Sequence, residues 1–386
     1  MSEWRKCPIG NVVTLMQGFA INAKSKHYMS DTPTRLPLLR IADMKNGTKE
    51  VFVKEDIPQR FIASNEDIIY TRTGNVGLVF RNNYGVVHNN CFTVTPQDER
   101  ELSRDYLYYA LKDKNFYDKA NALARGAAQP DLPHSSFCSI EISFPSLSKQ
   151  HCIASTLSRY DSLIDNYQKQ IKLLEEAAQR LYKEWFAQNN NLETIKLVDI
   201  SSKITDGVHN TVYNEEGSPY KLLSCKNVVG GHLMINSSER SISKDTFEKL
   251  RKRTQLEKGD ILVSTVGSVG EVVYLDIEPD HFEFQRSVGI IKADKNVITP
   301  LYVYYSLLNR KNELKRTAHG AAQQCLFISD LKNFEIPIGS KEQIQNFEHF
   351  AKPISERITN ARHQLRLLTE SRDRLLPKLL SGEIEV

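Results

Sequence analysis

Two long stretches of the chain place apolar side chains at an alternating spacing of four and three residues. The first runs from Ile153 to Trp185 without a miss, and the second runs from Phe347 to Leu379 with Arg372 as its one polar position. This spacing over more than four heptads predicts two long helices, each with a narrow apolar seam that packs against another helix. The leucine and isoleucine residues of the predicted seams are Ile153, Leu157, Ile164, Ile171, Leu174, Leu181, Ile354, Ile358, Leu365, Leu368, Leu375 and Leu379.

The second stretch contains two prolines, Pro353 and Pro377. Proline has no amide donor and its ring crowds the preceding helical turn. We therefore expect a kink or a helix end at these two positions.

About 145 residues precede each predicted helix, and they mix short apolar runs with turns. Residues 68–70 and 261–263 are apolar and β-prone, which predicts strands. The tyrosine-rich segments at 106–111 and 302–307 are expected to form short helices, opened by Arg104-Asp105 and by Pro300. The pattern predicts a compact α+β domain, with mixed α/β content and much irregular backbone.

The chain repeats itself at an offset of about 194 residues. Three segments recur in the same order: 67–77 as 260–270, 106–111 as 302–307, and 124–129 (Ala-Arg-Gly-Ala-Ala-Gln) as 318–323 (Ala-His-Gly-Ala-Ala-Gln). Chance explains one such match but hardly three in the same order. The chain therefore consists of two copies of one unit, each a globular domain followed by a long helix.

Chain order constrains how the two helices pair. The first helix passes through Asn189-Asn190-Asn191 into the second domain, and the second helix leaves that same domain. If the seams pack on each other, the helices are antiparallel, and the tandem domains are related by an approximate two-fold axis. Pairing within one chain is favoured over a homodimeric coiled coil by its higher effective concentration. The expected boundaries are domain one at 1–147, the central helix at 148–188, domain two at 189–339 and the C-terminal helix at 340–386.

Composition adds few constraints. The chain has 386 residues, 40% hydrophobic and 25% charged, with a net charge of +4, which permits an anionic partner without requiring one. Its six cysteines include no C-x-x-C pair and no zinc-ligand spacing, and scattered thiols suit a reducing cytosol. No signal peptide or run of 18 apolar residues is present, so we expect a cytoplasmic protein without membrane contact.

The sequence contains none of the motifs expected of the main DNA-processing enzymes. It has no Asn/Asp-Pro-Pro-aromatic turn for amino-group methylation, no Gly-x-x-x-x-Gly-Lys-Ser/Thr phosphate loop and no His-Glu-x-x-His metal motif. Asp280 and Glu283 come closest to a nuclease pair, but no lysine follows at the usual place, and exposed loop acids are the simpler interpretation. We predict no catalytic residues and no metal ligands.

Two glycine-containing motifs occur in both copies. The Gly-x-x-Gly segments at 74–77 and 267–270 would let the chain approach a phosphate closely, although taken alone a tight turn after a strand is the preferred interpretation. The Gly-Ala-Ala-Gln segments carry a glutamine that can pair with adenine. A motif shared by both copies cannot read two different sequences, so we expect a scaffold or backbone-contact role.

The repeat and two local motifs resemble the specificity subunit of type I restriction-modification systems. Residues 180–186 (Arg-Leu-Tyr-Lys-Glu-Trp-Phe) are similar to the end of that family's central helix. Residues 374–384 (Arg-Leu-Leu-Pro-Lys-Leu-Leu-Ser-Gly-Glu-Ile) are similar to the end of its C-terminal helix, and this phrase is specific. The resemblance covers essentially the whole chain.

This resemblance implies a non-catalytic subunit that recognises double-stranded DNA. Each domain would bind one half of a split, asymmetric target, and the helices would dock two modification (methyltransferase) subunits and set the spacing between the half-sites. Restriction subunits with motor and nuclease activity would join that core. No cofactor is expected in this chain, whereas S-adenosylmethionine, ATP and Mg are expected in the partner subunits.

Base-reading residues do not follow from the resemblance, because the recognition domains are the variable part of the family. Polar and basic loop residues are the candidates, since phosphates and base edges need cationic and amide donors, and a solvated surface residue is an equally good interpretation of each. The candidates are Lys24, Lys26, Arg40, Arg72, Asn75 and Arg125 in domain one, and Lys203, His209, Lys226, Ser268 and His319 in domain two.

Two other interpretations remain open. The chain would be a specificity-like DNA-binding module of another defence system if no adenine methyltransferase accompanies it. It would be a coiled-coil scaffold without DNA contact if no DNA is retained when the methyltransferase is present.

Overall fold

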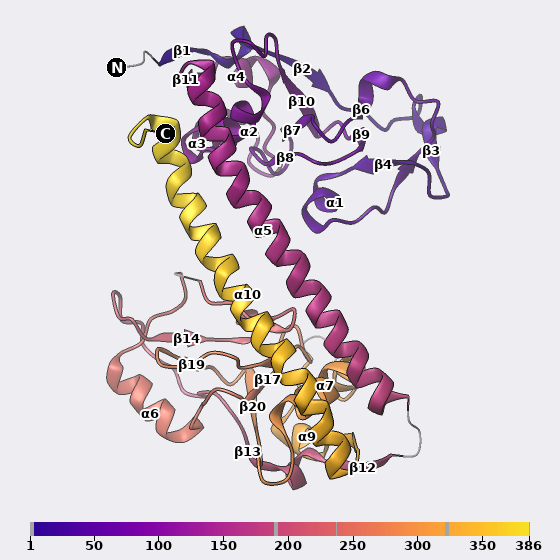
Figure 1. Cartoon of the computed structure of the whole chain (residues 1–386), viewed down its shortest axis with the longest axis vertical. Coiled ribbons are helices and arrows are strands. Elements are labelled where there is room, and N and C mark those ends of the chain that lie inside the picture. Colours follow the sequence, from indigo (N-terminus) through magenta and orange to yellow (C-terminus); the bar gives the residue numbers. More distant parts are fainter. Residues whose placement is uncertain (1–3, 189–191, 237, 321–323, 386) are drawn as a thin grey trace. The chain divides into compact units, whose positions relative to one another are not determined.

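The chain folds into two compact units, each of which contains part of both long helices (Figure 1). The computed structural model describes residues 4–188, 192–236, 238–320 and 324–385. Unit 1 comprises Met1–Asn166 and Leu365–Val386, and unit 2 comprises Tyr167–Gln364. The predicted linker Asn189–Asn191 lies outside the described residues.

Among its described residues, unit 1 builds its globular part from eleven short strands and four short α-helices. Its four-stranded antiparallel sheet has the order β2-β10-β7-β8, a five-stranded mixed sheet has the order β3-β5-β4-β9-β6, and β1 pairs with β11. The strands are β1 Arg5–Pro8, β2 Val13–Gln17, β3 Met29–Ser30, β4 Leu36–Leu39, β5 Phe52–Val53, β6 Ile62–Ala63, β7 Ile68–Thr71, β8 Val79–Phe80, β9 Gly85–Val87, β10 Cys91–Pro96 and β11 Glu141–Phe144. The helices are α1 Ile41–Asn46, α2 Arg104–Lys112, α3 Lys114–Leu123 and α4 His134–Cys138.

Unit 2 repeats the central part of this arrangement. Its four-stranded antiparallel sheet has the order β13-β20-β17-β18, and β12 pairs with β21 as β1 does with β11. Its strands are β12 Glu193–Lys196, β13 Ser201–Asp206, β14 Lys221–Leu223, β15 Val228–Val229, β16 His232–Leu233, β17 Ile261–Ser264, β18 Val272–Tyr274, β19 Phe282–Phe284, β20 Val288–Ala293 and β21 Glu335–Ile338. Its short helices are α6 Lys244–Thr254, α7 Pro300–Asn309, α8 Lys311–Arg316 and α9 Ile328–Asn333.

The predicted fold class, a tandem repeat of mixed α+β domains with two long helices, is confirmed. Strands β7 and β17 hold the two predicted apolar runs, and the tyrosine-rich segments form α2 and α7. The equivalent tyrosines Tyr106 and Tyr302 are fully buried, and the hydroxyl of each donates a 2.9 Å hydrogen bond to a strand carbonyl, Ser143 and Pro337 respectively. A buried hydroxyl needs such a partner, which explains why both copies keep tyrosine there.

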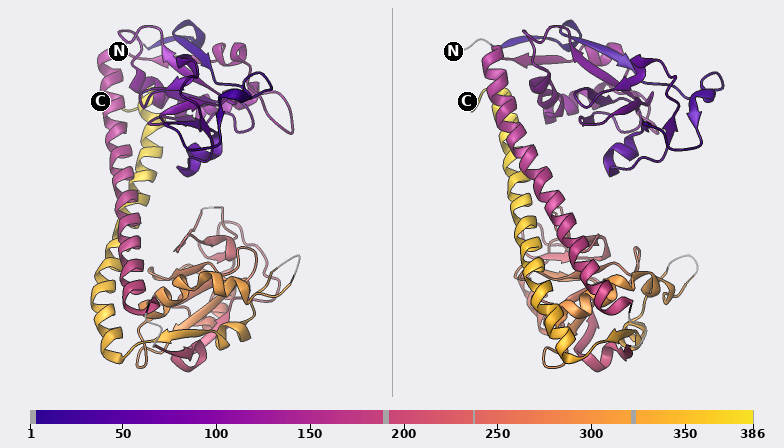
Figure 2. Two further views of the ribbon diagram at one scale, coloured as in Figure 1. Left: turned by 90° about the vertical axis from the view of Figure 1, so that its right-hand side faces the viewer. Right: turned by 45° about the vertical axis from the view of Figure 1, so that its right-hand side comes forward.

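The two long helices are α5, Leu147–Tyr182, followed by a π-helical turn at Lys183–Ala187, and α10, Lys341–Ser381. Within unit 1, the N-terminal part of α5 and the C-terminal part of α10 run side by side in opposite directions (Figure 2). All twelve predicted seam residues are buried or half-buried. The ends of the helices also join the domain cores, through Leu157 and Leu379 in unit 1 and through Phe186 and Phe347 in unit 2.

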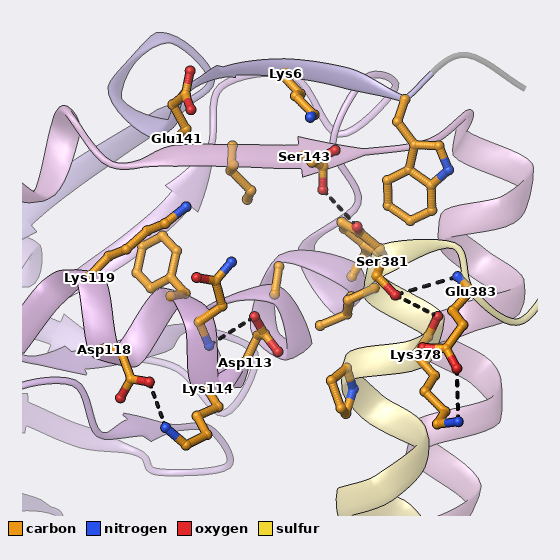
Figure 3. A pocket seen from close by; sticks show the side chains of 18 residues that line it. Lys6, Asp113, Lys114, Asp118, Lys119, Glu141, Ser143, Lys378, Ser381 and Glu383 are labelled. Carbon is orange, nitrogen blue, oxygen red and sulfur yellow. Dashed lines mark hydrogen bonds and ion pairs between the residues drawn. The ribbon is translucent and has the colours of Figure 1, made fainter.

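Of the kink or helix end expected at the two prolines, the helix end is wrong. The helix continues through Pro353 and Pro377, and both side chains are exposed. On a solvent-facing side of a helix, water can satisfy the carbonyl that each proline leaves without an amide partner. The helix ends at Ser381 (Figure 3), and Gly382 follows with a φ of +76° that permits a left-handed cap. A Cβ at Gly382 would lie 3.0 Å from the Trp4 ring, so the end of α10 lies close against the residue that precedes β1.

Candidate nucleic-acid interface

The two glycine motifs, about 50 residues apart in the sequence, are neighbours in unit 1. The amide of Gly74 donates to the Pro130 carbonyl at 2.8 Å, and the amide of Leu132 donates to the Arg72 carbonyl at 2.9 Å. These bonds join the Gly74–Gly77 turn after β7 to the loop at 124–131. We call the pair, residues 72–77 and 124–131, the twin loop of unit 1.

Unit 2 joins the corresponding segments by equivalent backbone bonds. The amide of Leu326 donates to the Thr265 carbonyl at 2.8 Å, and His319 and Cys325 exchange two bonds of 2.8 Å. Residues 321–323, which hold the second Ala-Ala-Gln, lie outside the described residues. The two copies therefore share the backbone geometry at this place, while the side chains differ.

The Arg72 side chain is bound to other residues within and beside the unit 1 twin loop. Its guanidinium contacts the Asp131 carboxylate at 2.7 Å and the Gln17 side-chain oxygen at 3.1 Å, and Thr73 donates to the same carboxylate at 2.5 Å. The hydrogen bond from Arg72 is the main cause that lowers the pKa of Asp131. In unit 2, Thr265 and Cys325 take the places of Arg72 and Asp131, so this ion pair belongs to unit 1 alone. Arg72 therefore braces the loop instead of presenting a free charge.

The tip of the twin loop presents free polar groups to solvent. Arg125 and Asn75 are exposed, and within the described part of the chain neither side chain has a hydrogen-bond or ion-pair partner. Ser268, the counterpart of Asn75, is exposed in the same way in unit 2. A cation and a small amide or hydroxyl beside flexible glycines suit contact with a phosphate backbone.

The segment between β2 and β3 supplies further charge in unit 1. Lys24 and Lys26 are exposed and form no ion pair with any described residue. Arg40, by contrast, holds Asp43 at 2.6 Å and Glu50 at 2.6 Å. The Asp43 side chain is only 4% exposed, so Arg40 balances a buried charge and its role is structural.

The candidates of unit 2 are mostly engaged with neighbours. Lys203 donates to the Arg253 carbonyl at 2.5 Å, His209 contacts Asp206 at 2.6 Å, and His319 lies 3.3 Å from Asp330. Lys226 lies 2.9 Å from the Glu239 carboxylate, which is 3% exposed. Burial acts to raise the pKa of Glu239, but the hydrogen bonds from Lys226 and Asn227 outweigh it and leave the pKa lowered.

Sequence reasoning missed two exposed cations of unit 2. Lys252 lies on α6 in the basic run 251–253, and Arg286 lies between β19 and β20. Neither side chain has a partner among the residues described. The run of three basic residues was visible in the sequence, whereas nothing there distinguishes Arg286 from other loop arginines.

Asp280 is exposed, as expected, but the expectation that Glu283 is an exposed loop acid is wrong, because Glu283 lies in the buried strand β19. Glu283 is fully buried, contacts the Arg251 guanidinium and accepts a hydrogen bond from Thr254 at 3.0 Å. No cluster of potential metal ligands occurs among the described residues. In the same part of the chain, no helix is both long and apolar enough to cross a bilayer.

Comparison with known proteins agrees with this architecture. The sequence profile of the type I restriction modification DNA specificity domain matches residues 1–176 and 191–365, one match for each copy of the repeat. The chain therefore belongs to the family of type I restriction-modification specificity subunits.

Two relatives and one solved structure each match most of the length of this chain. The type I restriction enzyme MjaIX specificity subunit of Methanocaldococcus jannaschii is 28% identical over 342 residues, 83% of this chain and 78% of the relative. The EcoBI specificity subunit of Escherichia coli is 22% identical over 420 residues, 99% of this chain and 86% of the relative. The crystal structure of the type I S subunit of M. genitalium superposes with a TM-score of 0.68 at 18% identity, covering 98% of this chain and 96% of that one.

Proposed function

We propose that each unit reads one half of a bipartite, asymmetric double-stranded DNA target and that the chain itself catalyses no reaction. The observation that carries this proposal is the twin loop, which has one backbone geometry in both copies and different side chains around it. A common backbone geometry suits contacts with the phosphate backbone, which is the same in every DNA sequence. Differing side chains suit two different base sequences.

The long helices would dock two modification subunits. Leu163, Leu173 and Leu367 lie off the predicted seams and are 45%, 65% and 39% exposed. Covering these leucines with a partner protein would remove apolar surface from water, which is worth about 25 cal/mol per Å². In this proposal the partners supply S-adenosylmethionine and methyl transfer, and restriction subunits supply ATP-driven translocation and Mg-dependent cleavage.

Helix length would set the gap between the half-sites. Each seam extends about 48 Å at 1.5 Å per residue. With a rise of about 3.4 Å per base pair, that length corresponds to half-site centres roughly 14 base pairs apart. Domains set inward from the helix ends would shorten the gap.

A methyl-transfer assay distinguishes the proposed function from its alternatives. The isolated chain, given labelled S-adenosylmethionine and mixed-sequence DNA, should incorporate no label, and adding the cognate modification subunit should produce methylation at one bipartite motif. Activity of the repurified chain alone would contradict the non-catalytic role. Retention of DNA without any methylation partner would favour a different defence system, and loss of all DNA retention would favour a scaffold.

A further inference from the structure

A three-residue connection between two strands lies beside the twin loop in each unit. Residues 88–90 (His-Asn-Asn) join β9 to β10 in unit 1, and residues 285–287 (Gln-Arg-Ser) join β19 to β20 in unit 2. The amide of Arg72 donates to the last carbonyl of the first connection at 2.8 Å, and the amide of Thr265 donates to the last carbonyl of the second at 2.9 Å. We call these two segments the connector tripeptides.

A second backbone segment fixes each connector tripeptide. In unit 1, the amide of Phe19 donates to the carbonyl of the residue before the tripeptide at 2.6 Å, and its carbonyl accepts from Asn89, the middle residue, at 2.9 Å. In unit 2, the amide of Val208 donates to the carbonyl of the residue before the tripeptide at 2.9 Å, and its carbonyl accepts from Arg286, the middle residue, at 3.0 Å. These matching bonds make Asn89 and Arg286 structural equivalents.

A glycine permits this close approach of two backbone segments in both units. A Cβ at Gly18 would overlap the His88 carbonyl, and a Cβ at Gly207 would overlap the Gln285 carbonyl. Any larger residue at either position would push the connector tripeptide away from its neighbour, because glycine alone leaves room for the carbonyl. The backbone of each tripeptide is therefore held in the same place in both units, which is the arrangement that a recognition residue needs.

The side chains of the two connector tripeptides differ at every position although their backbones match. Four of the six have no hydrogen-bond or ion-pair partner within the residues that the structure describes: Asn89, Asn90, Gln285 and Arg286. The Arg286 side chain is exposed, and Asn89 is half-buried. Each middle position therefore offers unpaired donors beside a loop suited to the DNA backbone, an amide in unit 1 and a guanidinium in unit 2.

We propose that the middle residue of each connector tripeptide reads one base pair of its half-site, Asn89 an A·T pair and Arg286 a G·C pair. A side-chain amide can form two hydrogen bonds with N6 and N7 of adenine, and a guanidinium can form two with O6 and N7 of guanine. The twin loop, whose backbone is common to both units, would hold the DNA backbone beside these residues. This inference rests on the proposed reading of DNA by each unit and names the residues that distinguish the two half-sites.

Sequencing of methylated sites tests both assignments, with the full chain in complex with its modification subunit. Arg286→Ala should relax one G·C pair in one half of the motif, and Asn89→Ala should relax one A·T pair in the other half, with every other position unchanged. The matched controls are Lys258→Ala and Asn115→Ala, which remove an exposed cation and an exposed amide without a described partner and should leave the motif unchanged. A variant that relaxes no position, or a base pair of the other type, would overturn the role of its residue.

Competition binding measures the size of each effect, also for a variant that no longer supports methylation. Duplexes that carry the wild-type motif with one base pair replaced compete against the intact motif. The wild-type complex should bind each replaced duplex at least about fivefold more weakly, whereas Arg286→Ala should lose this preference at one G·C pair and Asn89→Ala at one A·T pair. If Arg286→Ala weakened binding to all duplexes alike and kept every preference, Arg286 would contact only a phosphate, and its assignment would be overturned.

The outcomes separate this inference from the proposed function on which it rests. A wild-type complex that methylates no bipartite motif would overturn both. A bipartite wild-type motif that neither variant relaxes would overturn only the roles of Asn89 and Arg286. Both variants should keep the wild-type melting temperature, because neither side chain has a partner among the described residues, so a relaxed motif reports on recognition and not on folding.

Discussion

Arg372 of α10 and Asp161 of α5 form an ion pair within the apolar seam of unit 1, with 2.8 Å between Nη1 and Oδ1. Their side chains are 20% and 23% exposed. The hydroxyl of Tyr109 on α2 donates to the other oxygen of the same carboxylate at 2.9 Å. The one polar position of the predicted seam therefore has a defined partner, and a single carboxylate connects three helices.

Removing one member of this pair should destabilise unit 1. Arg372→Leu leaves the Asp161 carboxylate half-buried without its cation, which should cost about 1–3 kcal/mol of unfolding free energy. The double variant Arg372→Leu with Asp161→Leu should lose less unfolding free energy, because two apolar groups then face each other. Urea unfolding followed by fluorescence in a Trp185→Phe background reports on unit 1, since Trp4 is then the only tryptophan.

The exposed Arg374→Leu on the same helix is the matched control, and it should leave stability within about 0.5 kcal/mol. The ion pair would have no structural role if Arg372→Leu and Asp161→Leu, each alone, behaved like this control.

The contact between Arg40 and Asp43 predicts a pH dependence. The hydrogen bond from Arg40 is the main cause that lowers the pKa of Asp43. A carboxyl group with a lower pKa in the folded state contributes stability above its unfolded pKa of about 3.9, and this contribution is lost as pH falls through the folded value. Wild type should therefore exceed Asp43→Asn in unfolding free energy at pH 7, and the difference should shrink below about pH 4.

Chemical denaturation at several pH values measures that difference. The exposed Asp31→Asn serves as a control for the general effect of losing one carboxylate. A wild-type advantage that stayed constant, or grew, from pH 7 to pH 3 would show that the ionised Asp43 does not stabilise the fold.

Most of the fold was predictable because its signals are local or repeated. The four-three spacing marked both long helices, and buried runs such as β7 and β17 marked central strands. The helix end expected at Pro353 or Pro377 is wrong because both prolines lie off the apolar seam, where water can satisfy the freed carbonyls. The four-three spacing already places both prolines on the solvent-facing side of the helix.

The site was less predictable because long-range pairing decides which charges are free. Arg72 and Arg125 look alike in the sequence, yet Asp131, 59 residues from Arg72, binds the first and leaves the second exposed. Arg40 is similarly committed to Asp43 and Glu50. Composition and spacing cannot distinguish a structural arginine from one available to DNA.

Alanine replacement of Arg125 and of Arg72 should therefore have different effects on DNA binding and on the melting temperature. In the complex with the modification subunit, Arg125→Ala should weaken binding to specific and mixed-sequence DNA alike, and should reduce the slope of log affinity against log salt by about 0.9. Its melting temperature should not change, because the side chain has no described partner. Arg72→Ala should lower the melting temperature, because Asp131 loses its cation. Anisotropy titrations at several salt concentrations, together with thermal melts, measure both effects, and a wild-type salt slope in Arg125→Ala would exclude that contact.

Matched lengthening of both helices should widen the methylated motif. One heptad inserted between Asn166 and Tyr167 and another between Gln364 and Leu365 preserve the seam spacing and add about 10.5 Å. The gap between half-sites should grow by about three base pairs, with both half-sites unchanged. Insertion in one helix alone is the control and should abolish activity by misaligning the seams. An active double-insertion variant with its original gap would show that the helices do not measure the DNA.

Exchange of one recognition domain tests the two-reader account most directly. Residues 1–145 are replaced by the matching domain of a relative, and methylated sites are sequenced after expression with the modification subunit. The account predicts that one half of the motif changes while the other half and its methylated strand position stay the same, and that exchanging residues 192–339 changes only the opposite half. A change in both halves after either exchange, or in neither, would contradict it.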